Sequence, residues 1–195
     1  VARESYTLIP SVPVEEYTDP YGNLCQRLIS PPGKFVIRTS ADVLADDTID
    51  VAPGAPFVEV QNLPNEVLTY LLPSRYCESD QFIQMGREIV GDAIPGYDQV
   101  ARIEQWIRDQ FIYNEAAPHF QLSAADFNQM SEGVCRDFAP LGIALCRGLC
   151  IRARMVVGYL HKLEPMDFHA WFEAYVGGRW YTFDPTQSEP RGGRV

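Results

Sequence analysis

The sequence predicts an α+β fold in which a β-rich N-terminal domain precedes a core of helices packed on an antiparallel sheet. Two changes of pattern along the 195 residues carry this prediction. Residues 1–77 contain short alternating runs separated by turns rich in Pro and Gly, which is typical of strands. From about residue 78 apolar residues recur at helical spacing, and strand-like alternation returns only after residue 150. We therefore expect two domains, residues 1–77 and 78–195.

Four runs in the first domain are predicted to be strands: residues 5–9, 24–29, 35–39 and 57–60. The turn sequences DPYGN at 19–23 and SPPG at 30–33 separate some of them. The pattern indicates an antiparallel sheet or a fragment of a sandwich. The chain begins with Val1 and ends on RGGRV, which resembles the start of another strand, so we expect both ends to be truncated.

The second domain begins with helical segments. Apolar stripes predict one helix near residues 82–90 and a second near 100–111. The charged residues of the second helix are expected on its solvent side: Arg102, Glu104, Arg108 and Asp109. Ser123 is suited to cap a short helix that runs through Met130. Residues 135–149 predict a longer helix with one apolar face.

Three strands are predicted to follow, at residues 153–160, 168–176 and 179–183. Two glycines, Gly177 and Gly178, join the last two strands, and such a pair is typical of a tight hairpin turn. The core is therefore expected to contain an antiparallel sheet.

Composition excludes several classes of function. The net charge of −10 argues against nucleic acids and anionic membranes as partners, since both require clustered Lys and Arg. No apolar run is long enough to span a bilayer, and no signal peptide opens the chain. The five cysteines show no disulfide framework. Cys146 and Cys150 are four apart, but without a second pair or a nearby His they are expected to be buried free thiols rather than metal ligands. This usage fits a cytoplasmic location.

Cys135 has the setting of a reactive thiol. Gly133 allows a sharp loop, and the predicted helix begins at or just before Cys135. The positive end of the helix dipole and the unpaired N–H groups there stabilise a thiolate, and the same N–H groups can receive an oxyanion. The alternative is that Cys135 is a small buried apolar residue.

His169 and Asp184 are predicted to meet on neighbouring strands. With the two glycines in the turn, the hairpin register places Trp171 opposite Asp184, and His169 shares the face of Trp171. Asp184 is then diagonal to His169 and within hydrogen-bonding reach, where a carboxylate orients an imidazole. The alternatives are a core histidine and an Asp-Pro turn.

Several motifs, in this order, resemble the transglutaminase-like superfamily. They are GVCRDFA at 133–139, ALCR at 144–147, AR at 153–154, GY at 158–159, DFHAWFE at 167–173 and GRWYTFDP at 178–185. The resemblance covers roughly residues 80–190 and is closest to bacterial members described as cysteine proteases. It implies a papain-like core, with the cysteine helix packed on an antiparallel sheet, behind a β-rich N-terminal domain.

The resemblance implies that Cys135 is the nucleophile, His169 the general base and Asp184 the third member of a triad. In this superfamily an upstream aromatic or polar side chain often assists the oxyanion. Tyr113 is the candidate for that position and Gln129 is the alternative, although core packing explains Tyr113 equally well.

Other neighbours have structural interpretations beside the functional ones. Trp171 is a candidate wall of the substrate cleft, although a core position fits it as well. Asp137 and Arg154 are expected to form an ion pair that ties the helix to a strand. No acidic cluster has the spacing of a Ca²⁺ loop, so neither a metal nor another cofactor is expected.

Together these features predict a cysteine-dependent enzyme that transfers acyl groups from amide bonds through a thioester, as a protease, an amidase or a transglutaminase. The predicted partners are a protein or peptide amide and, for transfer, a primary amine. One alternative is a catalytically silent fold of this family that acts as a protein-binding module. An arylamine transferase that uses acyl-CoA is another.

Overall fold

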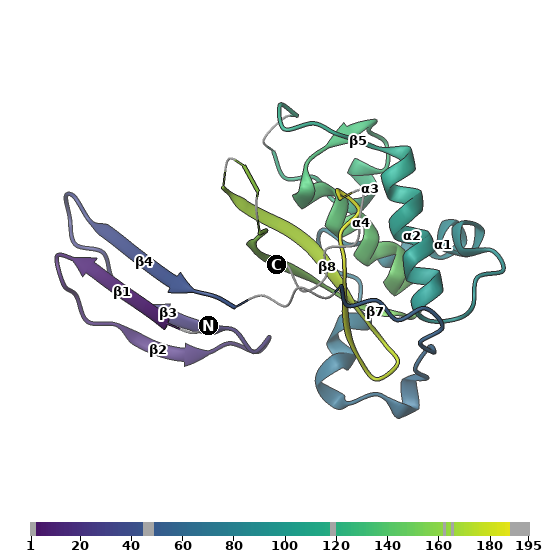
Figure 1. The fold of residues 1–195 in the computed structure, drawn as a ribbon, viewed down its shortest axis with the longest axis horizontal. Helices are drawn as coiled ribbons and strands as arrows, with labels where there is room; N and C mark the ends of the chain where they lie inside the picture. Colours follow the sequence, from purple (N-terminus) through teal and green to yellow (C-terminus); the bar gives the residue numbers. More distant parts are fainter. Residues whose placement is uncertain (1–2, 45–48, 118–119, 162, 165, 188–195) are drawn as a thin grey trace. The chain divides into compact units, whose positions relative to one another are not determined.

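The computed structural model describes residues 3–44, 49–117, 120–161, 163–164 and 166–187 (Figure 1). The chain divides into two compact units, residues 1–45 and 46–195. This division lies closer to the N-terminus than the boundary predicted at residue 77. Part of the segment before residue 77 pairs with the core, since Pro56 forms a β-bridge with Gly96.

The first unit consists of two antiparallel sheets of two strands each, β1 with β4 and β2 with β3. The strand bounds are β1 (Arg3–Ile9), β2 (Glu15–Thr18), β3 (Leu24–Arg27) and β4 (Val36–Asp42). In the turn between β2 and β3, the Asp19 carboxylate accepts the N–H groups of Tyr21 and Asn23 at 2.8 and 2.9 Å. Most side chains of this unit are exposed. Backbone pairing therefore defines the predicted β-rich N-terminal region, which is confirmed.

The second unit contains the helices and the larger sheet. The helices are α1 (Ile83–Val90), α2 (Tyr97–Gln110), α3 (Ala124–Phe127) and α4 (Cys135–Gly148), with short 3₁₀ helices η1 (Val60–Asn62), η2 (Asn65–Leu71) and η3 (Ser79–Gln81). The strands are β5 (Ile112–Tyr113), β6 (Glu132–Gly133), β7 (Arg152–Tyr159), β8 (Phe168–Val176) and β9 (Arg179–Phe183). Figure 1 shows the α-helices gathered on one side of the sheet, with α4 against β8. The predicted α+β class is confirmed.

The hairpin register agrees with the sequence prediction. The sheet has the order β7-β8-β9 and is antiparallel throughout. Val176 pairs with Arg179 across the turn. Gly177 and Gly178 have φ values of 59° and 89°, which glycine adopts without the steric cost that other residues meet there. The chain after β9 therefore emerges beside the beginning of β8.

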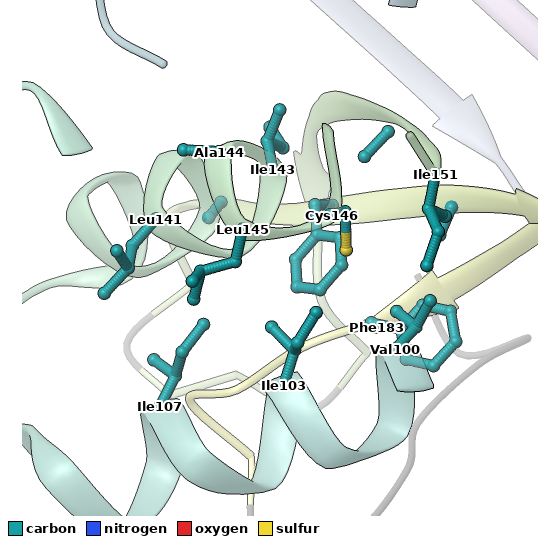
Figure 2. Close-up of a cluster of buried hydrophobic side chains, with 14 of the residues drawn as sticks. Val100, Ile103, Ile107, Leu141, Ile143, Ala144, Leu145, Cys146, Ile151 and Phe183 are labelled. Atoms are coloured by element: carbon teal, nitrogen blue, oxygen red, sulfur yellow. The ribbon is translucent and has the colours of Figure 1, made fainter. Parts of the chain in front are cut away.

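The core lies between α4, α2 and the sheet. In Figure 2, Ile103 and Ile107 of α2 point toward Leu141 and Leu145 of α4, and all four are fully buried. Burying a side chain of this size stabilises the fold by about 1.5–3 kcal/mol. On the sheet side of α4, a Cβ added to Gly142 would lie 2.5 Å from the Phe172 ring, so a glycine is needed for this close approach. This packing fixes where the N-terminus of α4 lies relative to β8.

One predicted strand is absent. Phe57 to Val60 do not form a strand, because their backbone groups bond outside any ladder: the Phe57 N–H donates to Pro95 O at 3.0 Å. The buried guanidinium of Arg152 donates to Val58 O at 2.5 Å. An alternating sequence predicts a strand only where a neighbouring strand exists to pair with it.

Candidate active site

Cys135 is the first residue of α4, where the backbone N–H groups have no carbonyl partner within the helix. A Cβ on the preceding Gly133 would lie 2.6 Å from the Phe127 ring, so glycine is required at this approach to the helix. The Asp137 carboxylate accepts the Val134 N–H at 3.0 Å and fixes the first turn. The thiol is thereby held at the positive end of the helix dipole.

The ion pair expected between Asp137 and Arg154 does not form. Arg154 Nε donates instead to Glu173 Oε2 at 2.7 Å, and its guanidinium lies 4.2 Å from the centre of the Trp180 ring. Asp137 is nearly fully buried, and this burial raises the pKa of its carboxyl despite the hydrogen bond from Val134. Asp137 therefore stabilises the first turn of α4, and Arg154 links two strands of the sheet.

The His169 ring pairs with Asp184 and lines the same pocket as Cys135. His169 Nε2 lies 2.7 Å from Asp184 Oδ2. A carboxylate only accepts hydrogen bonds, so Nε2 carries the proton, which leaves Nδ1 for another partner. Cys135 lies close enough to raise the pKa of the ring, and both residues line the same pocket. The structure thus brings together the three residues that the sequence singled out, with Asp184 at the position that the hairpin register predicts.

Thr186 holds the other oxygen of the same carboxylate. Its hydroxyl and its N–H donate to Asp184 Oδ1 at 2.7 and 3.1 Å. Both Asp184 oxygens are therefore engaged, which fixes the plane of the carboxylate toward His169. Thr186 was not among the residues predicted for the site, although an Asp followed two residues later by Thr is a local signal for such a turn.

Two charged residues of α2 hold the backbone of Asp184. Glu104 Oε1 accepts the Asp184 N–H at 2.8 Å, and Arg108 Nη2 lies 3.5 Å from the Asp184 carbonyl oxygen. Arg108 and Glu104 also form an ion pair at 3.3 Å. Burial raises the pKa of the Glu104 carboxyl, against the opposing effects of Arg108 and the Asp184 N–H. The prediction that Glu104 and Arg108 face solvent is wrong, because the chain after β9 packs over them.

The surroundings of His169 favour its charged form. Burial alone lowers the pKa of the imidazole, because a cation is costly away from water. The hydrogen bonds and charges of Asp184 and Cys135 outweigh that effect and raise the pKa to about 9. At neutral pH the buried ring, which is 2% exposed, is therefore in its protonated, charged form.

A pocket of about 500 Å³ opens beside the thiol. Its lining residues are Tyr113, Glu115, Val134, Cys135, Arg136, Met155, Val157, Leu163, Asp167, Phe168, His169 and Ala170. Cys135 itself is partly exposed. A molecule in this pocket can therefore reach the sulfur and the edge of the His169 ring, whereas Asp184 is not among the lining residues.

Of the two oxyanion candidates, only Tyr113 lines the pocket. Tyr113 pairs with Gly133 in the short parallel ladder between β5 and β6, which brings it beside the start of α4. Burial, and next the charge of Cys135, raises the pKa of Tyr113 to about 12, so its hydroxyl remains a donor at neutral pH. Gln129 is exposed after α3 and is not among the lining residues.

Trp171 is a buried neighbour of the histidine rather than a lining residue of the pocket. Its ring centre lies 6.2 Å from that of His169, with 20° between the ring planes. A Cβ on Gly158 would lie 2.9 Å from the indole, which shows how closely the next strand covers it. The structure places Trp171 in the core position that the sequence left open.

All five cysteines are free thiols. Cys146 is buried as expected, but Cys150 is exposed just beyond α4, so that half of the prediction is wrong. Among the residues that the structure describes, no group of three or more His, Cys, Asp and Glu side chains is placed to hold a metal ion. Within the same residues, no helix has the length and apolar character needed to cross a bilayer.

Comparisons with known proteins agree with this architecture. The chain resembles the crystal structure of the "Putative Cysteine Protease" from Cytophaga hutchinsonii, with 35% identity and a TM-score of 0.79 over 95% of the chain. The chain spans 65% of the length of that structure. It is 27% identical to the uncharacterized protein ML0607 of Mycobacterium leprae, over 91% of the chain and 68% of that protein.

A more distant likeness concerns the fold alone. The periplasmic domain of TgpA from Pseudomonas aeruginosa matches with a TM-score of 0.50 and 23% identity, over 62% of this chain and 46% of that one.

Residues 83–185, more than half of the chain, match the family described as the transglutaminase-like superfamily. With the cysteine helix packed on the antiparallel sheet, the chain therefore belongs to the transglutaminase-like superfamily.

Proposed function

We propose that this protein is a cysteine-dependent enzyme that transfers acyl groups from amide bonds of a protein or peptide. One observation carries the proposal. A buried imidazole, 2.7 Å from a carboxylate, lines the same pocket as a partly exposed thiol at a helix N-terminus. Core packing would explain a buried histidine, but it would not explain an accessible thiol beside it.

Acylation begins with the Cys135 thiolate attacking the amide carbonyl. A C–S bond forms and the carbonyl oxygen takes the negative charge. The Cys135 N–H at the start of α4 and the Tyr113 hydroxyl are the proposed donors to that charge. The C–N bond then breaks, and His169 gives its proton to the departing amine. The product is a thioester on Cys135.

Deacylation reverses the proton transfer. Water or a primary amine attacks the thioester, His169 takes the proton of the attacking group, and the thiolate leaves. Water gives hydrolysis, as in a protease or an amidase, and an amine gives transamidation, as in a transglutaminase. Asp184, held by Thr186, keeps the imidazole oriented through both steps.

The experiment that tests this proposal offers the protein a peptide library with and without a primary amine such as methylamine, followed by mass spectrometry. Cleavage, deamidation and amine incorporation each change the mass of a peptide differently. We expect at least one of these products with the wild type and with Cys146→Ala, which retains the site, and none with Cys135→Ala. If the wild type and Cys135→Ala give the same masses, the enzyme assignment fails and a binding module becomes the better account.

A further inference from the structure

The pocket beside Cys135 has one strongly apolar side that solvent reaches. Met155 and Val157 of β7 and Phe168 of β8 are 42%, 58% and 64% exposed. All three line the pocket. We call these three residues the apolar wall. An exposed apolar patch rimmed by polar groups is unusual for a surface and is typical of a binding site.

The apolar wall is a continuation of the face on which α4 packs. Met155 pairs with Phe172, and the Phe172 ring lies directly under Gly142 in the middle of α4. Val157 pairs with Ala170, farther along the same face. Helix α4 begins at Cys135 and runs away from the apolar wall. The wall is therefore not covered by α4, and it borders the pocket beside the thiol. An apolar group that covers the wall would therefore sit next to the sulfur.

The charges around the pocket are mainly negative. Glu115 and Asp167 contribute two carboxylates to the lining, and Arg136 contributes one guanidinium. One Asp167 oxygen accepts the Phe168 N–H at 2.7 Å, which keeps this carboxylate at the edge of the wall. His169 is charged, but its charge is balanced by Asp184 behind it. A substrate with an anionic group close to the scissile bond would meet net repulsion.

Resting on the proposed function, we propose that the pocket selects peptides with a large apolar side chain next to the reacting carbonyl and rejects those with an acidic side chain there. The apolar wall takes the side chain, and Glu115 and Asp167 oppose negative charge. The pocket volume of about 500 Å³ lies within the usual range for sites that hold a compact organic group. The occupant is the acyl-donor peptide itself.

Peptidyl chloromethyl ketones test this selection without knowledge of the natural substrate. Cys135 displaces chloride from such a reagent, a C–S bond replaces the C–Cl bond, and intact-protein mass records the adduct. Three reagents that differ only in the terminal residue (Phe, Lys or Glu) are compared, each scaled to its rate with glutathione. We expect the Phe reagent to modify Cys135 at least about tenfold faster than the Glu reagent, because apolar contact and charge repulsion act together. The Lys reagent should also react faster than the Glu reagent.

Matched variants assign the effect to the apolar wall. Val157→Asp is expected to reduce the Phe-to-Glu rate ratio to about one, because it places a charge in the wall. Ile94→Asp makes the same kind of change at another exposed apolar residue of the same unit, away from the pocket, and should leave the ratio unchanged. Glu115→Gln should increase the rate with the Glu reagent. Circular dichroism confirms that each variant is folded.

The outcomes separate this inference from the proposed function. Equal scaled rates for Phe and Glu, with products still formed from a peptide library, would overturn the selection and leave the enzyme assignment intact. Fast reaction with iodoacetamide but slow reaction with every peptidyl reagent would mean that another part of the chain covers the wall, which also overturns it. A Cys135 that reacts with none of these reagents would overturn both.

Discussion

The two ends of α4 carry the same functional group in opposite surroundings. Cys135 begins the helix, is partly exposed and lines a pocket together with His169. Cys146 lies three turns later and is fully buried among the apolar side chains of the core (Figure 2). Burial strongly raises the pKa of the Cys146 thiol, so it stays protonated and unreactive. The comparison teaches that the position along the helix, and not the residue type, decides which thiol can act.

Removing the two thiols one at a time is the most direct test of this comparison. Cys135→Ala should lower acyl transfer by about 10⁴–10⁶-fold, because the nucleophile is lost and no neighbouring group replaces it. The measurement is the rate of product formation with the best peptide found in the library. Residual activity within a factor of about ten of the wild type would show that the sulfur of Cys135 is not the nucleophile.

Asp184→Asn tests how far the reaction at Cys135 depends on a His169 ring that is oriented and charged by Asp184. We expect activity to fall by about 10²–10⁴-fold, since the amide cannot hold the same tautomer or stabilise the imidazolium. The pH dependence should change as well. In the wild type, activity that depends on protonated His169 falls as the pH rises through about 9.

In Asp184→Asn that decline should move to lower pH, because burial then acts on the pKa of His169 with less opposition. The free energy of unfolding of the wild type should also decrease as the pH rises. The contribution of protonated His169 to folding is complete below its ordinary pKa of 6.5 and is lost as the pH rises through about 9. An unchanged pH profile in Asp184→Asn would separate the carboxylate from the imidazole.

Glu104→Ala sharpens the account of how Asp184 is positioned. The variant removes the acceptor of the Asp184 N–H and leaves Arg108 without its ion pair. We expect turnover to fall by about tenfold, since the carboxylate is less well aimed. Arg102→Ala, at an exposed position of the same helix whose ion pair is with Asp92, is the control. A Glu104→Ala protein with lower stability but normal turnover and a normal pH profile would limit Glu104 to a structural role.

Cys146→Ala gives the smallest effect on activity. Turnover should stay within about twofold of the wild type, because Cys146 lies three turns from Cys135 in the buried apolar core. The free energy of unfolding should fall by about 1–2 kcal/mol, since the missing sulfur leaves a small cavity in the core. Chemical denaturation measures this change. A loss of activity as large as that of Cys135→Ala would end the distinction between the two thiols.

Sequence patterns were sufficient for parts that depend on local chemistry or on a short hairpin. The turn at Gly177 fixes the register of β8 and β9, so the meeting of His169 and Asp184 followed from counting residues. The start of α4 at Cys135 followed from the glycine before it. Contacts between distant segments were not accessible in this way. The helical pattern places Glu104 on the solvent side of α2, but the chain after β9 packs over it. The alternating pattern predicts a strand at Phe57, but no strand forms there.

The central claim, that the start of α4 activates its thiol, is tested most directly inside one molecule. Cys150 is exposed just beyond the other end of the same helix and serves as the reference thiol. The wild type is treated with limiting iodoacetamide between about pH 6 and pH 8, near the range where imidazoles titrate, and modification of each cysteine is followed by peptide mass mapping. The account predicts that Cys135 reacts at least about tenfold faster than Cys150 at the lower pH, because it lies at the positive end of the helix dipole and beside the charged His169 ring. Equal or slower reaction of Cys135 across this range would contradict it.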